Sequence, residues 1–163
     1  MRSGVRLGID VGKARIGVAR SDFHGMLASP VETVPRDLEG DAHVKPLVTL
    51  IQEHEAIEVL IGLPLALSGN ETASTQDARK VAEQLAAMCP VPIRYVDERL
   101  STVSASVQLR ASGKKPSRSR DRIDQLAAVV ILQNALEAER SSGRPPGTLL
   151  NDESEAVSYT HLT

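Results

Sequence analysis

The chain has 163 residues, a formal net charge of -2, and 41% hydrophobic and 25% charged residues, so it fits one domain with enough length to bury a core. Only 2% of the residues are aromatic, which argues against a nucleic-acid surface that works mainly by stacking bases on rings. No apolar stretch could span a bilayer or serve as the core of a signal peptide. We therefore expect a cytoplasmic protein that does not act in a membrane.

The single cysteine, Cys89, excludes an internal disulfide and a zinc cluster built from cysteines. We expect it to be a buried thiol at the end of a helix. An intermolecular disulfide through Cys89 remains open from the sequence alone.

The first third of the chain predicts three strands. Apolar residues alternate over Val5–Asp10 and resume over Arg15–Arg20 after a glycine-containing turn, which is typical of a hairpin. A third strand is expected over Leu27–Val34, where Pro30 indicates a sheet edge or an irregular start.

Helices and strands alternate over the rest of the chain. The expected elements, in order, are a helix over Ala42–His54, a strand over Ile57–Ile61 covered on both faces, a helix over Ala73–Met88 capped by Thr72 or Asn70, a strand in "VPIRYVDER", a helix from Ser101 or Thr102 to about Ser112, and a helix from about Asp121 to Arg140. Three antiparallel strands followed by alternating elements predict an α/β fold with one mixed, five-stranded sheet flanked by helices. We expect residues 1–147 to form this single domain and residues 148–163 to be a disordered or non-native tail.

Acidic residues stand where their neighbours are apolar. Asp10 ends the first strand, Asp97 and Glu98 end the fifth, and Asp124 lies at helical spacing from the stripe Ala127, Ala128, Ile131 and Ala135. Taken singly, each is more simply a turn residue, a cap or a partner of the helix dipole. Brought together at one sheet edge, such carboxylates repel one another unless cations neutralise them. Oxygen ligands without histidine or cysteine suit Mg²⁺ or Mn²⁺.

A basic segment, "RASGKKPSRSRDR", precedes Asp124 and is expected to be a loop. Its side chains Lys114, Lys115, Arg118, Arg120 and Arg122 could hold a phosphate backbone beside the acidic residues, or could simply be solvated. The four histidines lie away from the acidic blocks in the sequence, and we expect all of them, His24, His43, His54 and His161, at the surface.

Four blocks of the sequence, "GIDVGKARIGVARSD", "GLPLALSGNET", "VDERLSTVSA" and "DQLAAVVIL", resemble the signature blocks of the YqgF/RuvX family in order and spacing. The resemblance implies a ribonuclease H-like fold and a hydrolase, a nuclease that uses a divalent metal. Matched by motif, it implies Asp10, Glu98 and Asp124 as the catalytic and metal-binding residues. The usual "DG" of the second block is "SG" here, at Ser68–Gly69, so that loop says less about substrate contacts.

Residues near these motifs have two interpretations each. Arg99 could clamp the scissile phosphate or pair with Asp97, and Asp97 is expected to support the site rather than touch metal. Gly8, Gly12 and Gly17 could keep the hairpin low for an approaching nucleic-acid backbone, or could only form the turn.

The resemblance favours processing of the 5′ end of pre-16S ribosomal RNA in ribosome biogenesis. A Holliday junction resolvase acting on four-way DNA, or a non-catalytic module that binds RNA or the ribosome, is the alternative. The actin-like sugar kinases of the same superfamily need a second large lobe, for which this chain is too short. The sequence does not decide between RNA and DNA, or between a monomer and a homodimer.

Overall fold

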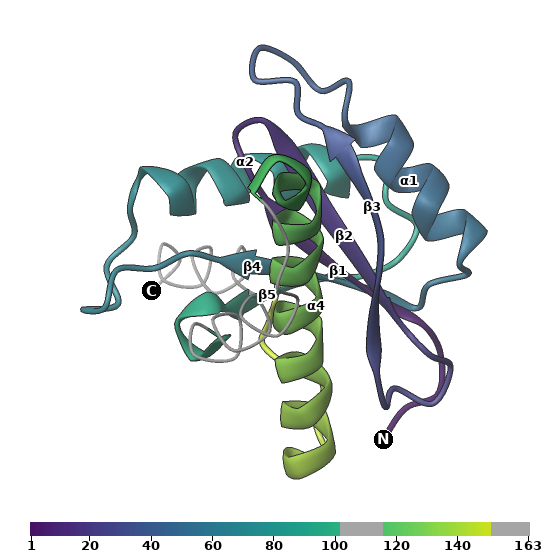
Figure 1. The fold of residues 1–163 in the computed structure, drawn as a ribbon. Coiled ribbons are helices and arrows are strands. Elements are labelled where there is room, and N and C mark those ends of the chain that lie inside the picture. Colours follow the sequence, from purple (N-terminus) through teal and green to yellow (C-terminus); the bar gives the residue numbers. More distant parts are fainter. Residues whose placement is uncertain (102–115, 151–163) are drawn as a thin grey trace, which may run out of the picture.

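The computed structural model describes residues 1–101 and 116–150, and between positions 100 and 124 it describes the side chain of Ile123 alone. One six-stranded sheet runs through this part of the chain, in the order β3-β2-β1-β4-β5-β6 (Figure 1). The strands are β1 (Arg6–Val11), β2 (Arg15–Ser21), β3 (Ala28–Pro35), β4 (Glu58–Leu63), β5 (Ile93–Asp97) and β6 (Thr148–Leu149). The α/β class and the mixed sheet are confirmed.

The hairpin and the third strand form as the alternating pattern predicts. Strands β1 and β2 pair antiparallel, with Asp10 opposite Gly17, and β3 adds antiparallel to β2. The register of β2 with β3 shifts between Val18 and Ala19, at the point where Pro30 of β3 lies opposite Ala19. This strand forms one edge of the sheet.

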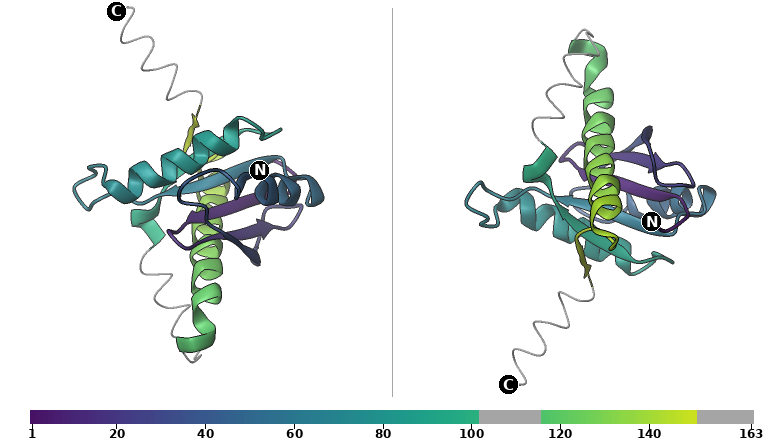
Figure 2. Two further views of the ribbon diagram at one scale, coloured as in Figure 1. Left: turned by 90° about the horizontal axis from the view of Figure 1, so that it is seen from above. Right: turned by 90° about the horizontal axis from the view of Figure 1, so that it is seen from below.

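Strands β1, β4 and β5 run parallel to one another. All six residues of β4 are buried, as expected for an apolar strand without alternation. Helices α1 (Val44–Glu53) and α2 (Ala73–Ala86) cover one face of the sheet, and α4 (Pro116–Ser142) lies across the other (Figure 1 and Figure 2). Because β1, β4 and β5 are parallel, their carboxyl ends lie at one edge of the sheet, and the candidate site is at that edge.

The ends of the helices follow local chemistry. Thr72 caps α2, since its side chain accepts a hydrogen bond from the backbone N–H of Thr75 while the Thr75 hydroxyl accepts one from the N–H of Thr72. Helix α4 begins at Pro116, earlier than expected, so residues 116–122 are helical rather than a loop. Proline is favoured in the first turn of a helix because its fixed φ suits that position and its missing N–H is not needed there.

The last part of the chain contains a strand that the sequence did not reveal. Thr148 and Leu149 of β6, in the segment expected to be a tail, pair antiparallel with Tyr95 and Arg94 of β5. Two residues are too few to give a periodic signal. The helix expected after Ser101 and the remainder of the tail lie outside the described residues, and the turn η1 (Glu98–Ser101) follows β5 directly.

One of the histidine predictions is wrong. His43 is 1% exposed, with Nε2 2.8 Å from Oε1 of Gln84 on α2 and Nδ1 accepting the backbone N–H of Asp37 at 3.2 Å. Its burial follows from its place just before α1, whose apolar face packs on the sheet. His24 is exposed and His54 is half-buried, whereas His161 lies outside the described residues.

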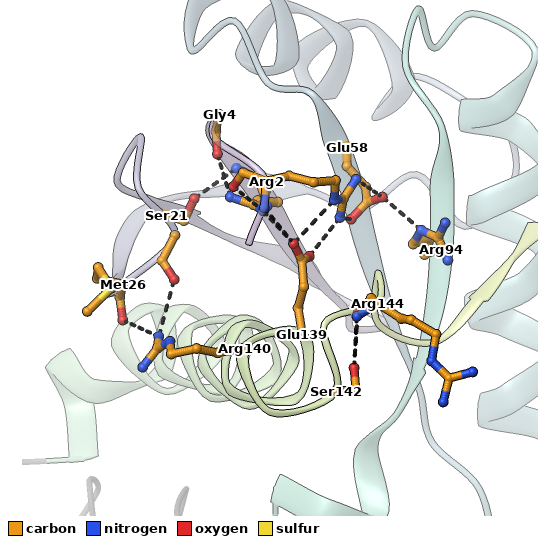
Figure 3. A network of polar contacts seen from close by, with 12 residues as sticks. Arg2, Gly4, Ser21, Met26, Glu58, Arg94, Glu139, Arg140, Ser142 and Arg144 are labelled. Carbon is orange, nitrogen blue, oxygen red and sulfur yellow. Dashed lines mark hydrogen bonds and ion pairs between the residues drawn. The ribbon is translucent and has the colours of Figure 1, made fainter.

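A buried ion network joins the amino ends of β1 and β4 to the end of α4 (Figure 3). Glu139 of α4 binds Arg2 at 2.7 Å and Arg6 at 2.9 Å, and Glu58 of β4 binds Arg2 at 3.0 Å and Arg94 at 2.8 Å. The side chains of Arg6, Glu58 and Glu139 are 1%, 2% and 3% exposed. Charges buried so deeply need partners of opposite sign, so the network fixes α4 on the sheet at this end.

No helix of the described chain is long and apolar enough to cross a membrane.

Candidate active site

The carboxyl ends of β1, β4 and β5 lie at one edge of the sheet because the three strands run parallel. Asp10 lies near the end of β1, and Glu98 follows the last residue of β5 and opens the turn η1. Strand β4 lies between β1 and β5. The Glu98 side chain must therefore reach across β4 to meet Asp10.

Gly62 of β4 provides the space for that reach. A Cβ atom at Gly62 would lie 2.7 Å from Cγ of Glu98, 2.9 Å from its Cδ and 2.7 Å from Cδ1 of Ile131 on α4. Glu98 thus lies on bare backbone under α4, where it forms a side-chain hydrogen bond with Asp10. One sign of this arrangement is visible in the sequence, namely a glycine inside an otherwise apolar strand, which often marks a close approach.

The contact changes the acidity of Glu98. Burial is the largest cause, and the negative charge of Asp10, the hydrogen bond with Asp10 and the charge of Asp97 add to it, so the pKa of Glu98 rises to about 8. The anion of Glu98 is disfavoured at this place, so a nearby positive charge would stabilise it. The predicted convergence of Asp10 and Glu98 is present in the structure.

The donor set fits a hard divalent cation. Both groups are carboxylates, and Mg²⁺ and Mn²⁺ prefer oxygen ligands. Asp10 and Glu98 would hold such a cation, and its positive charge would offset the repulsion between the two carboxylates. Among the side chains that the structure describes, which do not include that of Asp124, no group of three or more His, Cys, Asp and Glu lies close enough to hold a metal.

Asp97 and Arg99 form a separate pair beside the two acids. The Arg99 Nε atom donates to Asp97 Oδ1 at 3.0 Å, and its Nη2 donates to Oδ2 at 2.5 Å. The hydrogen bond from Arg99 holds the pKa of Asp97 below its usual value. Arg99 also donates to the backbone oxygen of Leu67, in the loop between β4 and α2, at 3.3 Å. Both interpretations of Arg99 stay open, because the guanidinium is exposed as well as paired.

Helix α4 leads toward the same edge of the sheet. Its residues Glu139, Leu132 and Ile131 meet, in turn, Arg6, Gly8 and Gly62, which lie progressively nearer the carboxyl ends of the strands. The helix also contacts the turn η1. Position 124 lies one helical turn before Ala128 and continues this progression. The Asp124 side chain itself is outside the described part of the structure.

The basic residues are placed only in part. Arg118, Arg120 and Arg122 belong to the first turns of α4, with their side chains outside the description. Lys114 and Lys115 lie outside the described residues altogether.

Two glycines of the hairpin, Gly8 and Gly12, serve packing and turn formation. A Cβ atom at Gly8 would lie 2.7 Å from Cβ of Leu132 and 3.0 Å from the backbone oxygen of Ala128. The space over Gly8 is therefore filled by α4, and the expectation that it admits a nucleic-acid backbone is wrong. Gly12 donates its N–H to the backbone oxygen of Arg15 at 2.9 Å, closing the turn between β1 and β2.

Comparison with known proteins gives concordant results. A family model described as "RuvX: Holliday junction resolvase" matches residues 4–138. A protein of Clavibacter michiganensis subsp. michiganensis named "Putative pre-16S rRNA nuclease" is 57% identical over 150 residues, which cover 92% of this chain and 93% of that protein. A protein of the same name from Streptomyces coelicolor is 56% identical over 149 residues, which cover 90% of this chain and 88% of that protein.

The fold has a counterpart among solved structures. Thermus thermophilus RuvC in complex with a Holliday junction substrate superposes with a TM-score of 0.59 and 17% sequence identity, over 90% of this chain and 99% of that one. At this identity the likeness concerns the fold alone, and it confirms the ribonuclease H-like architecture that the sequence blocks imply.

Proposed function

Since the chain belongs to the RuvX family, we propose that it is a divalent-metal-dependent nuclease that hydrolyses phosphodiester bonds during 5′-end processing of pre-16S ribosomal RNA. The observation that carries this proposal is the contact of Asp10 with Glu98 across Gly62, with the pKa of Glu98 raised to about 8. The names of the relatives support the choice of RNA as substrate.

Asp10 and Glu98 are assigned as metal ligands and Asp124 as the third carboxylate. Bound Mg²⁺ or Mn²⁺ would supply Lewis-acid stabilisation of the attacking and leaving oxygens of the phosphodiester. Asp10 and Glu98, already in contact, would hold the cation through their carboxylate oxygens. Asp124 is supported by its motif and by the course of α4, which brings position 124 toward the same edge.

Arg99 is assigned to the scissile phosphate. Asp97 orients its guanidinium, and the exposed face keeps donors available for a second acceptor. Lys114, Lys115, Arg118, Arg120 and Arg122 are assigned to the nucleic-acid backbone because they immediately precede Asp124 in the chain. Substrate would thus meet positive charge where the acidic pair is approached from the start of α4.

The test presents purified protein, with Mg²⁺ or Mn²⁺, with a precursor 16S RNA 5′-end fragment and with a synthetic four-way DNA junction in parallel. Asp10→Asn should lose all cleavage. Asp41→Asn changes an exposed aspartate before α1 and should cleave like the parent. Cleavage of the RNA alone, absent in Asp10→Asn, supports the proposal, whereas undiminished cleavage by that variant refutes the assignment of Asp10.

A DNA junction is the second candidate substrate because the matching family model is described as a Holliday junction resolvase. Paired symmetrical cuts in the junction, with intact RNA, would select this activity and require a homodimer, since two active sites must face one junction. Binding of RNA without cleavage of either substrate would instead indicate a non-catalytic module.

A further inference from the structure

Two exposed lysines lie beside α2, which covers the face of the sheet opposite α4 (Figure 2). The turn between β1 and β2 places Lys13 and Ala14 at its exposed tip, three residues beyond Asp10 at Lys13. Because this turn follows the carboxyl end of β1, the Lys13 ammonium lies at the same edge of the sheet as the candidate active site.

Arg36 fixes the position of this turn. Its backbone N–H donates to the oxygen of Ala14 at 3.0 Å, and its Nη1 donates to the oxygen of Gly12 at 3.1 Å. The side chain of Arg36 is only 1% exposed. Its two terminal nitrogens also bind Asp77 of α2, at 2.9 and 2.6 Å. The turn is therefore held against α2 at a fixed place.

Asp77 is already neutralised by Arg36. Both of its oxygens accept hydrogen bonds from the guanidinium, and this contact, the largest cause, lowers the pKa of Asp77. The positive charges of Lys80 and Lys13 also act on Asp77, so both ammonium groups lie near it. Lys80 is three residues beyond Asp77 on the same helix and is exposed.

The remaining charge of this cluster is positive and accessible. Arg36 and Asp77 cancel, and Arg36 is too deeply buried to reach a ligand. Arg79, the neighbour of Lys80, pairs with Glu71 at 2.8 Å and lies over the ring of Tyr95. Lys13 and Lys80 form no ion pair of their own with a described carboxylate, so their ammonium groups can accept an external anion.

We propose that Lys13 and Lys80 form a phosphate-binding patch on the α2 side of the active site, which grips the nucleic-acid backbone next to the bond that is cut. The inference rests on the proposed function and extends its substrate contacts. A nucleic-acid strand lying across this edge of the sheet would then meet positive charge on both sides of Asp10 and Glu98. The Arg36–Asp77 pair would hold the patch in position.

The test measures binding rather than cleavage. In an Asp10→Asn background, Lys13→Ala, Lys80→Ala and the double variant are titrated against a fluorescein-labelled single-stranded RNA over a series of KCl concentrations. The slope of log affinity against log salt is negative, and each lost phosphate contact should make it shallower by about 0.7. Lys45→Ala, which removes an exposed lysine from α1, should leave the slope unchanged, and Lys13→Arg with Lys80→Arg should restore it.

The outcomes separate this proposal from the function on which it rests. If the parent protein cleaves RNA but the double alanine variant keeps the parental slope, the patch is refuted while the nuclease stands. If the slope becomes shallower as expected but the parent cleaves nothing, the patch is supported and the nuclease is refuted. A parent protein that binds no labelled RNA at low salt overturns the patch. Thermal unfolding of every variant checks that the fold is retained.

Discussion

Replacing Gly62 by alanine tests the geometry of the acidic pair directly. The new Cβ would lie 2.7 Å from Cγ of Glu98, whereas ordinary contacts begin at 3.4 Å, so the side chain must move by about 0.7 Å. Ile131, also 2.7 Å away, limits movement toward α4. Displacements near 1 Å in a catalytic arrangement cost on the order of 100-fold in rate, and overpacking costs roughly 1–3 kcal/mol of stability.

The assay compares cleavage rates of Gly62→Ala and Gly40→Ala at saturating metal, with thermal unfolding of both. Gly40→Ala is matched in crowding, since its Cβ would lie 2.7 Å from Oδ2 of Asp37, but that contact is the end of a flexible side chain far from the site in the sequence. We expect a large loss of rate for Gly62→Ala alone. A folded Gly62→Ala protein that cleaves at the parental rate would show that Glu98 does not need its place over Gly62.

Two further predictions concern buried carboxyl groups. The folded protein favours the protonated form of Glu98, so this group adds stability below pH 4.5 that is lost as the pH rises through about 8. Glu98→Gln should therefore abolish cleavage, yet its stabilisation of the metal-free protein in urea unfolding should increase over that pH range. A difference in unfolding free energy that does not change with pH would contradict this. Glu139→Gln leaves the buried charge of Arg6 without its partner and should lower the free energy of unfolding by roughly 3–5 kcal/mol. Glu137→Gln, exposed on the same helix, should change it by less than about 0.5 kcal/mol. Equal effects of the two substitutions would show that the ion pair contributes nothing.

Local patterns were sufficient to predict most of the sheet. The alternation of β1 and the unbroken apolar run of β4 each reflect burial on one face or on two, and burial is what holds those strands in the structure. Strand β6 could not be predicted, because two residues carry no period and their partners, Arg94 and Tyr95, lie more than fifty residues away in the chain. His43 was misassigned for a similar reason, since a polar residue gives no sign of a distant partner such as Gln84.

The candidate site shows the same division between local and distant information. That Asp10 and Glu98 share an edge follows from the parallel order of strands, which the alternation of elements implies. That they touch depends on Gly62, a residue of a third strand whose significance appears only when β4 lies between the other two. The role of Gly8 was misread because the sequence cannot say that Leu132, far along the chain, fills the space above it.

Near the two ends of α4, two acids on the same face of one sheet are in opposite electrostatic states, the buried Glu139 and the half-buried Glu98. At the amino ends of the strands, burial raises the pKa of Glu139, but hydrogen bonds from Arg2 and the charge of Arg6 outweigh it, so its pKa lies below the usual value. At the carboxyl ends, burial and the charge of Asp10 act together on Glu98 and raise its pKa. The fold therefore can stabilise a buried carboxylate with arginine, and does so where α4 is anchored. At the edge of the candidate active site the Glu98 anion is disfavoured unless positive charge is supplied, whereas the Glu139 anion already receives it from Arg2 and Arg6. We therefore expect added divalent cation to change the ionisation of Glu98 and to leave that of Glu139 unchanged.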